Sequence, residues 1–133
     1  MTATPLPILA ITMGDPAGIG SEIAVKTLLE QEMYDICRPL VIGDLTMMQD
    51  AARMCASDVK FNAVDNPEDG VYQLGTIDVF DMGIMELSDL AYKTVTAKQG
   101  DAGFQYVKKA IELAMANEVH GTVTGPINKE SMN

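Results

Sequence analysis

The stretch ILAITMGDPAGIG, residues 8–20, decides the fold expected of this 133-residue chain. Its first four residues form a short apolar run rich in branched side chains, which is typical of a buried strand. A glycine-rich turn follows over residues 14–20, and apolar residues from Val25 to Leu29 then recur at helical spacing. The stretch therefore predicts the first strand and the first helix of an α/β fold.

Strand-like and helix-like segments alternate along the rest of the chain. Residues 40–42 form a second apolar run that stops at Gly43, and Asp44 can cap a helix that follows it. Residues 59–64 and 76–80 have the composition of two further strands, with turn-forming residues between them.

The last third of the chain is expected to hold one long helix and one short strand. Residues 81–98 show no clean period, so we expect them to be mostly irregular. An amphipathic helix then runs through about Asn117, and residues 122–124 form a brief strand. The apolar face of the helix is expected to carry Phe104, Val107, Ile111 and Ala114. The alternation predicts an α/β fold with a mainly parallel sheet and helices on both faces.

Composition and charge exclude several classes of protein. With 47% hydrophobic and 21% charged residues, the chain has the make-up of one folded domain. The net charge of −10 argues against nucleic acid and anionic membranes as partners. No apolar run is long enough to cross a bilayer and the N-terminus has no signal-peptide pattern, so we expect a cytoplasmic protein.

The ionisable residues do not form a recognisable metal site. Residues 61–92 are acidic and contain no Lys or Arg, which we interpret as a solvated acidic face rather than a cation site. Cys37 and Cys55 are far apart, and His120 is the only histidine. One His and two separated Cys cannot complete a zinc site, so we expect reduced, buried thiols and no metal ligand in this chain.

Glycine-containing loops follow three of the expected strands, at residues 14–20, 43–44 and 125–129. Because the carboxyl ends of parallel strands lie along one edge of a sheet, we expect these loops to converge where such sheets bind ligands. No catalytic residue is expected in the chain. The residues expected to bind a cofactor or line the cleft are Gly14, Asp15, Gly18, Gly20, Thr124, Asn128 and Lys129.

Each loop also has a purely structural interpretation. Glycines let a ligand approach the backbone, and the free N–H groups of a helix that starts near Ser21 favour an anion, but Asp15 and Glu22 add negative charge there. A glycine-rich turn between strand and helix is as often merely structural, and the spacing is not Gly-x-Gly-x-x-Gly. Lys129 can bind a phosphate or simply be solvated. Both interpretations stay open.

Three motifs carry a resemblance to a known family. ITMGDPAGIGSEI, residues 11–23, strongly resembles the opening motif of the 4-hydroxythreonine-4-phosphate dehydrogenases of vitamin B6 biosynthesis. VIGD, residues 41–44, resembles the family's second strand end, and VTGPINK, residues 123–129, its third signature. The first motif is also similar to a shorter loop of isopropylmalate and isocitrate dehydrogenases, which implies their fold. Ser21 replaces the family's usual Pro, and both residues suit a helix start.

The resemblance implies an NAD- or NADP-dependent oxidoreductase, with residues 1–133 as the N-terminal part of a longer, two-domain, homodimeric enzyme. Its small phosphorylated substrate would be 4-phosphooxy-L-threonine or a related four-carbon hydroxy acid. A divalent metal (zinc, magnesium or cobalt) would assist oxidation and the loss of carbon dioxide. The family's metal-binding histidines and basic phosphate contacts follow the third signature at a distance, beyond Asn133, so the chain alone is expected to be inactive.

Three alternatives accompany this interpretation. The enzyme could instead oxidise cis-dihydrodiol carboxylates, since the residues that would set the substrate are mostly missing from the chain. A phosphate acyltransferase of related fold needs no nicotinamide, but the GDPAGIG run at residues 14–20 argues against it. The third alternative is an inactive α/β module.

Overall fold

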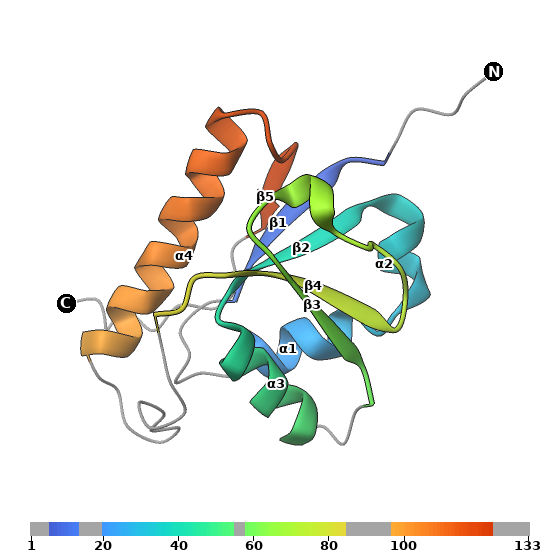
Figure 1. Cartoon of the computed structure of the whole chain (residues 1–133), viewed down its shortest axis with the longest axis horizontal. Coiled ribbons are helices and arrows are strands. Elements are labelled where there is room, and N and C mark those ends of the chain that lie inside the picture. The colour runs from blue at the N-terminus through green and yellow to red at the C-terminus, as the bar shows by residue number, and fades with distance from the viewer. Residues whose placement is uncertain (1–5, 14–19, 55–57, 85–96, 124–133) are drawn as a thin grey trace.

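The computed structural model describes residues 6–13, 20–54, 58–84 and 97–123 (Figure 1). Within them lies a five-stranded sheet, parallel throughout, in the order β3-β4-β2-β1-β5. The strands are β1 (Ile8–Thr12), β2 (Arg38–Gly43), β3 (Lys60–Val64), β4 (Thr76–Asp81) and β5 (Gly121–Val123). The helices are α1 (Gly20–Thr27), α2 (Gln31–Ile36), α3 (Leu45–Met54), the 3-10 turn η1 (Pro67–Asp69) and α4 (Ala97–Met115). The expected α/β fold is confirmed.

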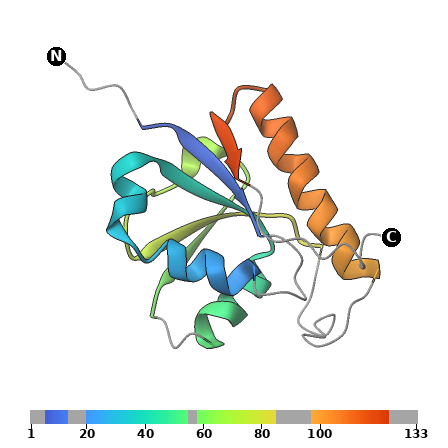
Figure 2. The same ribbon diagram turned by 180° about the vertical axis from the view of Figure 1, so that it is seen from behind.

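Helices cover both faces of the sheet. The chain moves from β1 to β2 and then to β3 toward one edge, and from β3 to β4 and then to β5 toward the other. Right-handed connections between parallel strands place these two directions of travel on opposite faces. Accordingly, α1 and α3 pack together on one face, while α4 lies on the other against β1, β2 and β5 (Figure 1, Figure 2).

The core lies on both sides of the central strands. Ile8, Ala10, Leu40, Ile42 and Val79 are all 0% exposed. Residues 40–42 are buried without alternation because β2 is covered on both faces, as a continuous apolar run predicts. This burial makes the central strands a rigid support for the loops that leave their carboxyl ends.

The buried face of α4 differs from the expected one. Phe104 and Ile111, expected to be buried, are 50% and 49% exposed. The residues that pack against the sheet are instead Ala102, Tyr106, Ala110 and Leu113. Two alanines allow the helix to approach the strands closely, with the large Tyr106 ring between them, and such a mixed face gives only a weak apolar signal in the sequence.

Helix α2 was not predicted by the sequence pattern. The expected first helix ends at Thr27, and a separate six-residue helix, Gln31–Ile36, precedes β2. None of the residues of α2 is buried, so it has no apolar stripe from which it could have been recognised.

The acidic stretch over residues 61–92 contains a carboxylate that is not solvated, Asp78 in β4. Asp78, expected on an acidic surface, is 2% exposed. Its carboxylate accepts hydrogen bonds at 2.8 Å from the backbone N–H groups of Val71 and Tyr72 and from Nδ2 of Asn62. The connection between β3 and β4 contains no α-helix, only η1, so this buried carboxylate holds the crossover loop against the sheet.

Tyr34 is expected to make the protein sensitive to alkaline pH. Its hydroxyl donates to the carbonyl oxygen of Leu28 at 3.1 Å, and burial, followed by the charges of Asp78 and Cys37, raises the pKa of Tyr34 to about 12. The folded state thus favours the neutral phenol. Its stabilisation is complete below the unfolded pKa of about 10 and is lost as the pH rises through the folded pKa.

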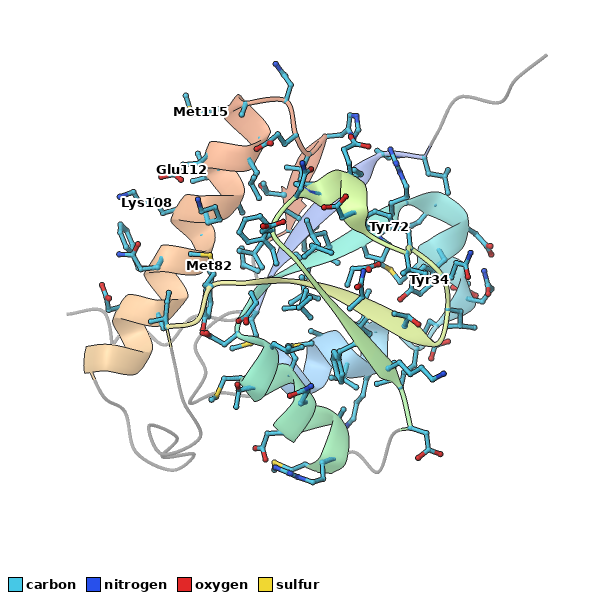
Figure 3. All side chains as sticks on the ribbon, viewed as in Figure 1. Tyr34, Tyr72, Met82, Lys108, Glu112 and Met115 are labelled. Atoms are coloured by element: carbon cyan, nitrogen blue, oxygen red, sulfur yellow. The ribbon has the colours of Figure 1, made fainter. Side chains whose placement is uncertain are left out.

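The measurement is urea denaturation of the parent and of Tyr34→Phe at several pH values from 8 upward. The parent should lose stability more steeply than Tyr34→Phe above the ordinary tyrosine pKa. Because burial also raises the pKa of Tyr72, Tyr72→Phe serves as a parallel variant; both tyrosines lie away from α4 (Figure 3). Equal alkaline slopes for the parent and Tyr34→Phe would contradict the assignment.

Candidate functional site

The carboxyl ends of the strands share one edge of the sheet. All five strands are parallel, and β1 lies between β2 and β5, with Ile11 paired to Val41 on one side and Val123 on the other. The segments that follow β1, β2 and β5 therefore start side by side. The strand ends that precede the three glycine-containing loops thus share one edge, and the convergence of the loops themselves stays a prediction, because residues 14–19 and 124–129 lie outside the described part of the chain.

Most of the expected cleft residues lie outside the described part of the chain. Gly20 is the first residue of α1, so the helix starts within one residue of the expected position. The other expected cleft residues, outside the described residues, are Gly14, Asp15, Gly18, Thr124, Asn128 and Lys129. What the structure describes is the scaffold from which these segments leave.

The direction of the connections changes between β2 and β4. The connection after β2 enters α3 on one face, whereas α4, which follows β4, lies on the opposite face. In open α/β sheets the space between two such strands is where ligands commonly bind. The sequence alone did not reveal this position, because β3 follows β2 along the chain but lies beyond β4 in the sheet.

Two carboxylates bridge this position reciprocally. Asp44, which follows β2, accepts the backbone N–H of Ile84 through Oδ1 at 2.6 Å. Asp81, the last residue of β4, accepts the backbone N–H of Leu45 through Oδ1 at 3.1 Å. Each carboxylate thus holds the segment that follows the other strand, and the N–H of Met82 extends the ladder to the carbonyl of Gly43 at 2.8 Å.

Asp44 also connects the sheet edge to α4. Its Oδ2 is hydrogen-bonded to the hydroxyl of Tyr106, which lies in the buried face of α4. Asp44 is 1% exposed and Tyr106 is 0% exposed. Asp44 does stand at the start of α3, as the sequence indicated, but these two bonds join it to other elements. Asp81 supplies a side-chain acceptor to the first N–H of α3, a role compatible with the positive end of a helix.

His120 makes a structural contact at the amino ends of the strands. It is exposed, and its Nδ1 accepts the backbone N–H of Ile8 at 2.9 Å. The backbone N–H of His120 in turn donates to the carbonyl of Ile8 at 2.8 Å. These bonds fasten the start of β1 to the residue before β5, at the amino ends of the strands and away from the ligand edge.

The outer side of α4 faces away from the sheet. Lys108, Glu112 and Met115 are exposed there and point away from the sheet (Figure 3).

Across the described residues, no helix has the length and apolar character needed to span a membrane. In the same part of the chain, no group of three or more His, Cys, Asp or Glu side chains could hold a metal ion.

The fold and the ligand edge of the sheet define a class of protein domain. An open parallel sheet, wound in both directions and crossed by helices on both faces, is a doubly wound α/β domain with its ligand edge at the carboxyl ends of the strands. Comparison with known proteins identifies a family within this class. The model of the family described as Pyridoxal phosphate biosynthetic protein PdxA matches residues 35–133. The chain belongs to this family.

Individual relatives agree with the family. A candidate D-threonate 4-phosphate dehydrogenase of Symbiobacterium thermophilum is 44% identical over 126 residues, which are 95% of this chain and 38% of the relative. A 4-hydroxythreonine-4-phosphate dehydrogenase structure from Burkholderia phymatum matches with a TM-score of 0.92 and 39% identity, covering 97% of this chain and 39% of that one. The resemblance seen in the three motifs is confirmed.

A relative of different specificity has the same fold. The terephthalate 1,2-cis-dihydrodiol dehydrogenase structure from Burkholderia xenovorans matches with a TM-score of 0.76 and 26% identity, over 96% of this chain and 36% of that one. In each of these comparisons the chain spans less than two-fifths of the relative's length. The scaffold described above is therefore common to relatives whose names state different substrates.

Proposed function

We propose that the full-length polypeptide that carries this sequence is an NAD- or NADP-dependent dehydrogenase of a phosphorylated four-carbon hydroxy acid. The observation that carries the proposal is the match to the Burkholderia phymatum 4-hydroxythreonine-4-phosphate dehydrogenase, with its TM-score of 0.92 over 97% of this chain. D-Threonate 4-phosphate and 4-phosphooxy-L-threonine are the two leading substrates, because the relatives are named for them. We propose that carbon dioxide is released after oxidation.

This chain would form part of a two-domain, homodimeric, cytoplasmic enzyme and supply one wall of its cleft. We assign cofactor binding or cleft lining to Gly14, Asp15, Gly18, Gly20, Thr124, Asn128 and Lys129. The N–H groups at the start of α1 favour an anionic group of the ligand, and β1 and β5 bring the two segments that contain these residues to adjacent points of the edge. A bound nicotinamide would accept the hydride from the alcohol carbon.

The described residues do not fit a divalent metal. No group of three or more His, Cys, Asp or Glu side chains within them could hold an ion, and the carboxylates of the buried Asp44 and Asp78 and of the exposed Asp81 already accept hydrogen bonds from the chain. We therefore assign no step to a metal held by this chain. A metal used by the full-length enzyme would take its ligands from other residues.

The test is an assay of the purified full-length protein with NAD⁺ and NADP⁺. With a phosphorylated hydroxy acid as the substrate, we expect one of the two nicotinamide cofactors to be reduced. The reduction is measured by absorbance. A cis-dihydrodiol carboxylate is the second candidate substrate, because the terephthalate dihydrodiol dehydrogenase shares the fold. Acyl transfer from an acyl phosphate without any nicotinamide turnover would overturn the proposal, and the 133-residue chain alone should be inactive.

Two of the assigned cleft residues have different expected roles. We expect Asp15 to organise its glycine-rich segment, so Asp15→Ala should destabilise the enzyme by about 1–2 kcal/mol and lower its melting temperature. We expect Lys129 to contact only the ligand, so Lys129→Ala should leave the melting temperature unchanged and reduce kcat/KM. Thermal melting and steady-state kinetics of the two full-length variants are the measurements. Normal kinetics for Lys129→Ala would return this residue to the solvated surface.

A further inference from the structure

The position between β2 and β4 has the topology of a ligand site, but side chains of the protein occupy it. The segments after these strands lead to opposite faces of the sheet, which is the arrangement that opens a crevice in related folds. Here Asp44 and Tyr106 are buried at that position, with exposures of 1% and 0%.

The bonds across this position fix both segments that leave it. Asp44 holds the N–H of Ile84 and the hydroxyl of Tyr106, and Asp81 holds the N–H groups of Leu45 and Gly83. These bonds join residues 36 to 62 positions apart in the sequence, apart from the local one to Gly83. The two bonds to Asp44 are buried or partly buried and the two to Asp81 are exposed, and hydrogen bonds to charged acceptors are among the stronger ones in proteins. Opening the gap between β2 and β4 would break several of them at once.

We propose that Asp44 and Asp81 are positioning residues that close the sheet edge between β2 and β4 and leave ligand binding to the β1–β5 half. This inference rests on the proposed dehydrogenase function for its kinetic test. Asp44 touches no ligand and acts through Ile84 and Tyr106, which it holds at the edge. An acidic residue at the end of a strand in a ligand-binding edge would otherwise suggest a general base or a metal ligand.

Asparagine at position 44 separates these two roles. Its Oδ1 can accept the N–H of Ile84, and its Nδ2 can donate to the hydroxyl oxygen of Tyr106, since a tyrosine hydroxyl both donates and accepts. Asp44→Asn therefore keeps both contacts, with the direction of the Tyr106 bond reversed, and removes the charge. Asp44→Ala removes both contacts and leaves the partners buried without this acceptor.

The kinetic experiment uses the full-length enzyme with these two variants. For Asp44→Asn we expect kcat/KM within about threefold of the parent and the same pH profile, whereas loss of a general base costs about 100-fold or more. For Asp44→Ala we expect kcat/KM to fall by at least about tenfold at a temperature where the variant is folded, because misplacing a site wall impairs substrate orientation. A 100-fold loss in Asp44→Asn with parental melting would overturn the proposal.

A second experiment needs no activity and keeps the two proposals distinguishable. Hydrogen exchange by mass spectrometry in the full-length protein should show the segment around Ile84 exchanging at least about tenfold faster in Asp44→Ala, and the start of α3 exchanging faster in Asp81→Ala. Asp44→Asn should exchange like the parent. Unchanged exchange in both alanine variants would overturn the bracing role, whereas an enzyme without dehydrogenase activity but with the expected exchange would refute only the proposed function.

Discussion

Replacing Asp78 with alanine is expected to lower the free energy of unfolding by about 3–5 kcal/mol, a large share of the 5–15 kcal/mol typical of a domain. Asp78 is 2% exposed, and its carboxylate accepts three hydrogen bonds, from Asn62, Val71 and Tyr72. Alanine would leave these donors without their acceptor in a place that water hardly reaches. Because the connection contains only the 3-10 turn η1 and no α-helix, it should detach from the sheet without these bonds.

The measurement is equilibrium urea denaturation of the parent and the variant. Asp65→Ala is the control, since Asp65 lies in the connection that Asp78 holds but is exposed, and its effect should stay within about 0.5 kcal/mol. Asp78→Asn keeps one carbonyl oxygen and should fall between the two. Similar unfolding midpoints for Asp78→Ala and Asp65→Ala would show that the carboxylate does not hold the loop.

Gly43→Ala is expected to destabilise the protein by about 2–3 kcal/mol, although alanine is ordinarily the better residue in a strand. A Cβ atom at Gly43 would lie 2.8 Å from Cβ of Met13 and 2.9 Å from its Sδ. Met13 is 0% exposed and its Cβ is fixed to the backbone, so it cannot move aside. The strain would fall at the ligand edge, between the ends of β1 and β2.

Gly121→Ala is the control for this prediction, because it also places a methyl group on a strand glycine. There the nearest atom is Cδ2 of Leu9 at 3.0 Å, the far end of a flexible side chain, so the cost should be below about 1 kcal/mol. Thermal melting should separate the two variants by several degrees, on the order of 3–5 °C per kcal/mol for a domain of this size. Identical melting temperatures would mean that Met13 can rearrange freely.

Much of the candidate site could be anticipated only in outline. The glycine-containing segments after β1 and β5 were recognised from their residue types, and the shared edge followed from the expectation of parallel strands. The reciprocal contacts of Asp44 and Asp81 could not be foreseen, because they depend on β4 lying directly beside β2. The strand order that brings them together is a property of the whole sheet.

The sequence by itself determined which segments form buried strands, and the tertiary structure decided which side chains meet. Apolar runs such as residues 40–42 identified buried strands, because burial on both faces requires apolar side chains at every position. The face of α4 was misjudged, because close packing on the sheet selected Ala102 and Tyr106 over the more apolar Phe104 and Ile111. Local composition states which residues can be buried, whereas the partners of a buried side chain depend on which distant segment the fold places beside it.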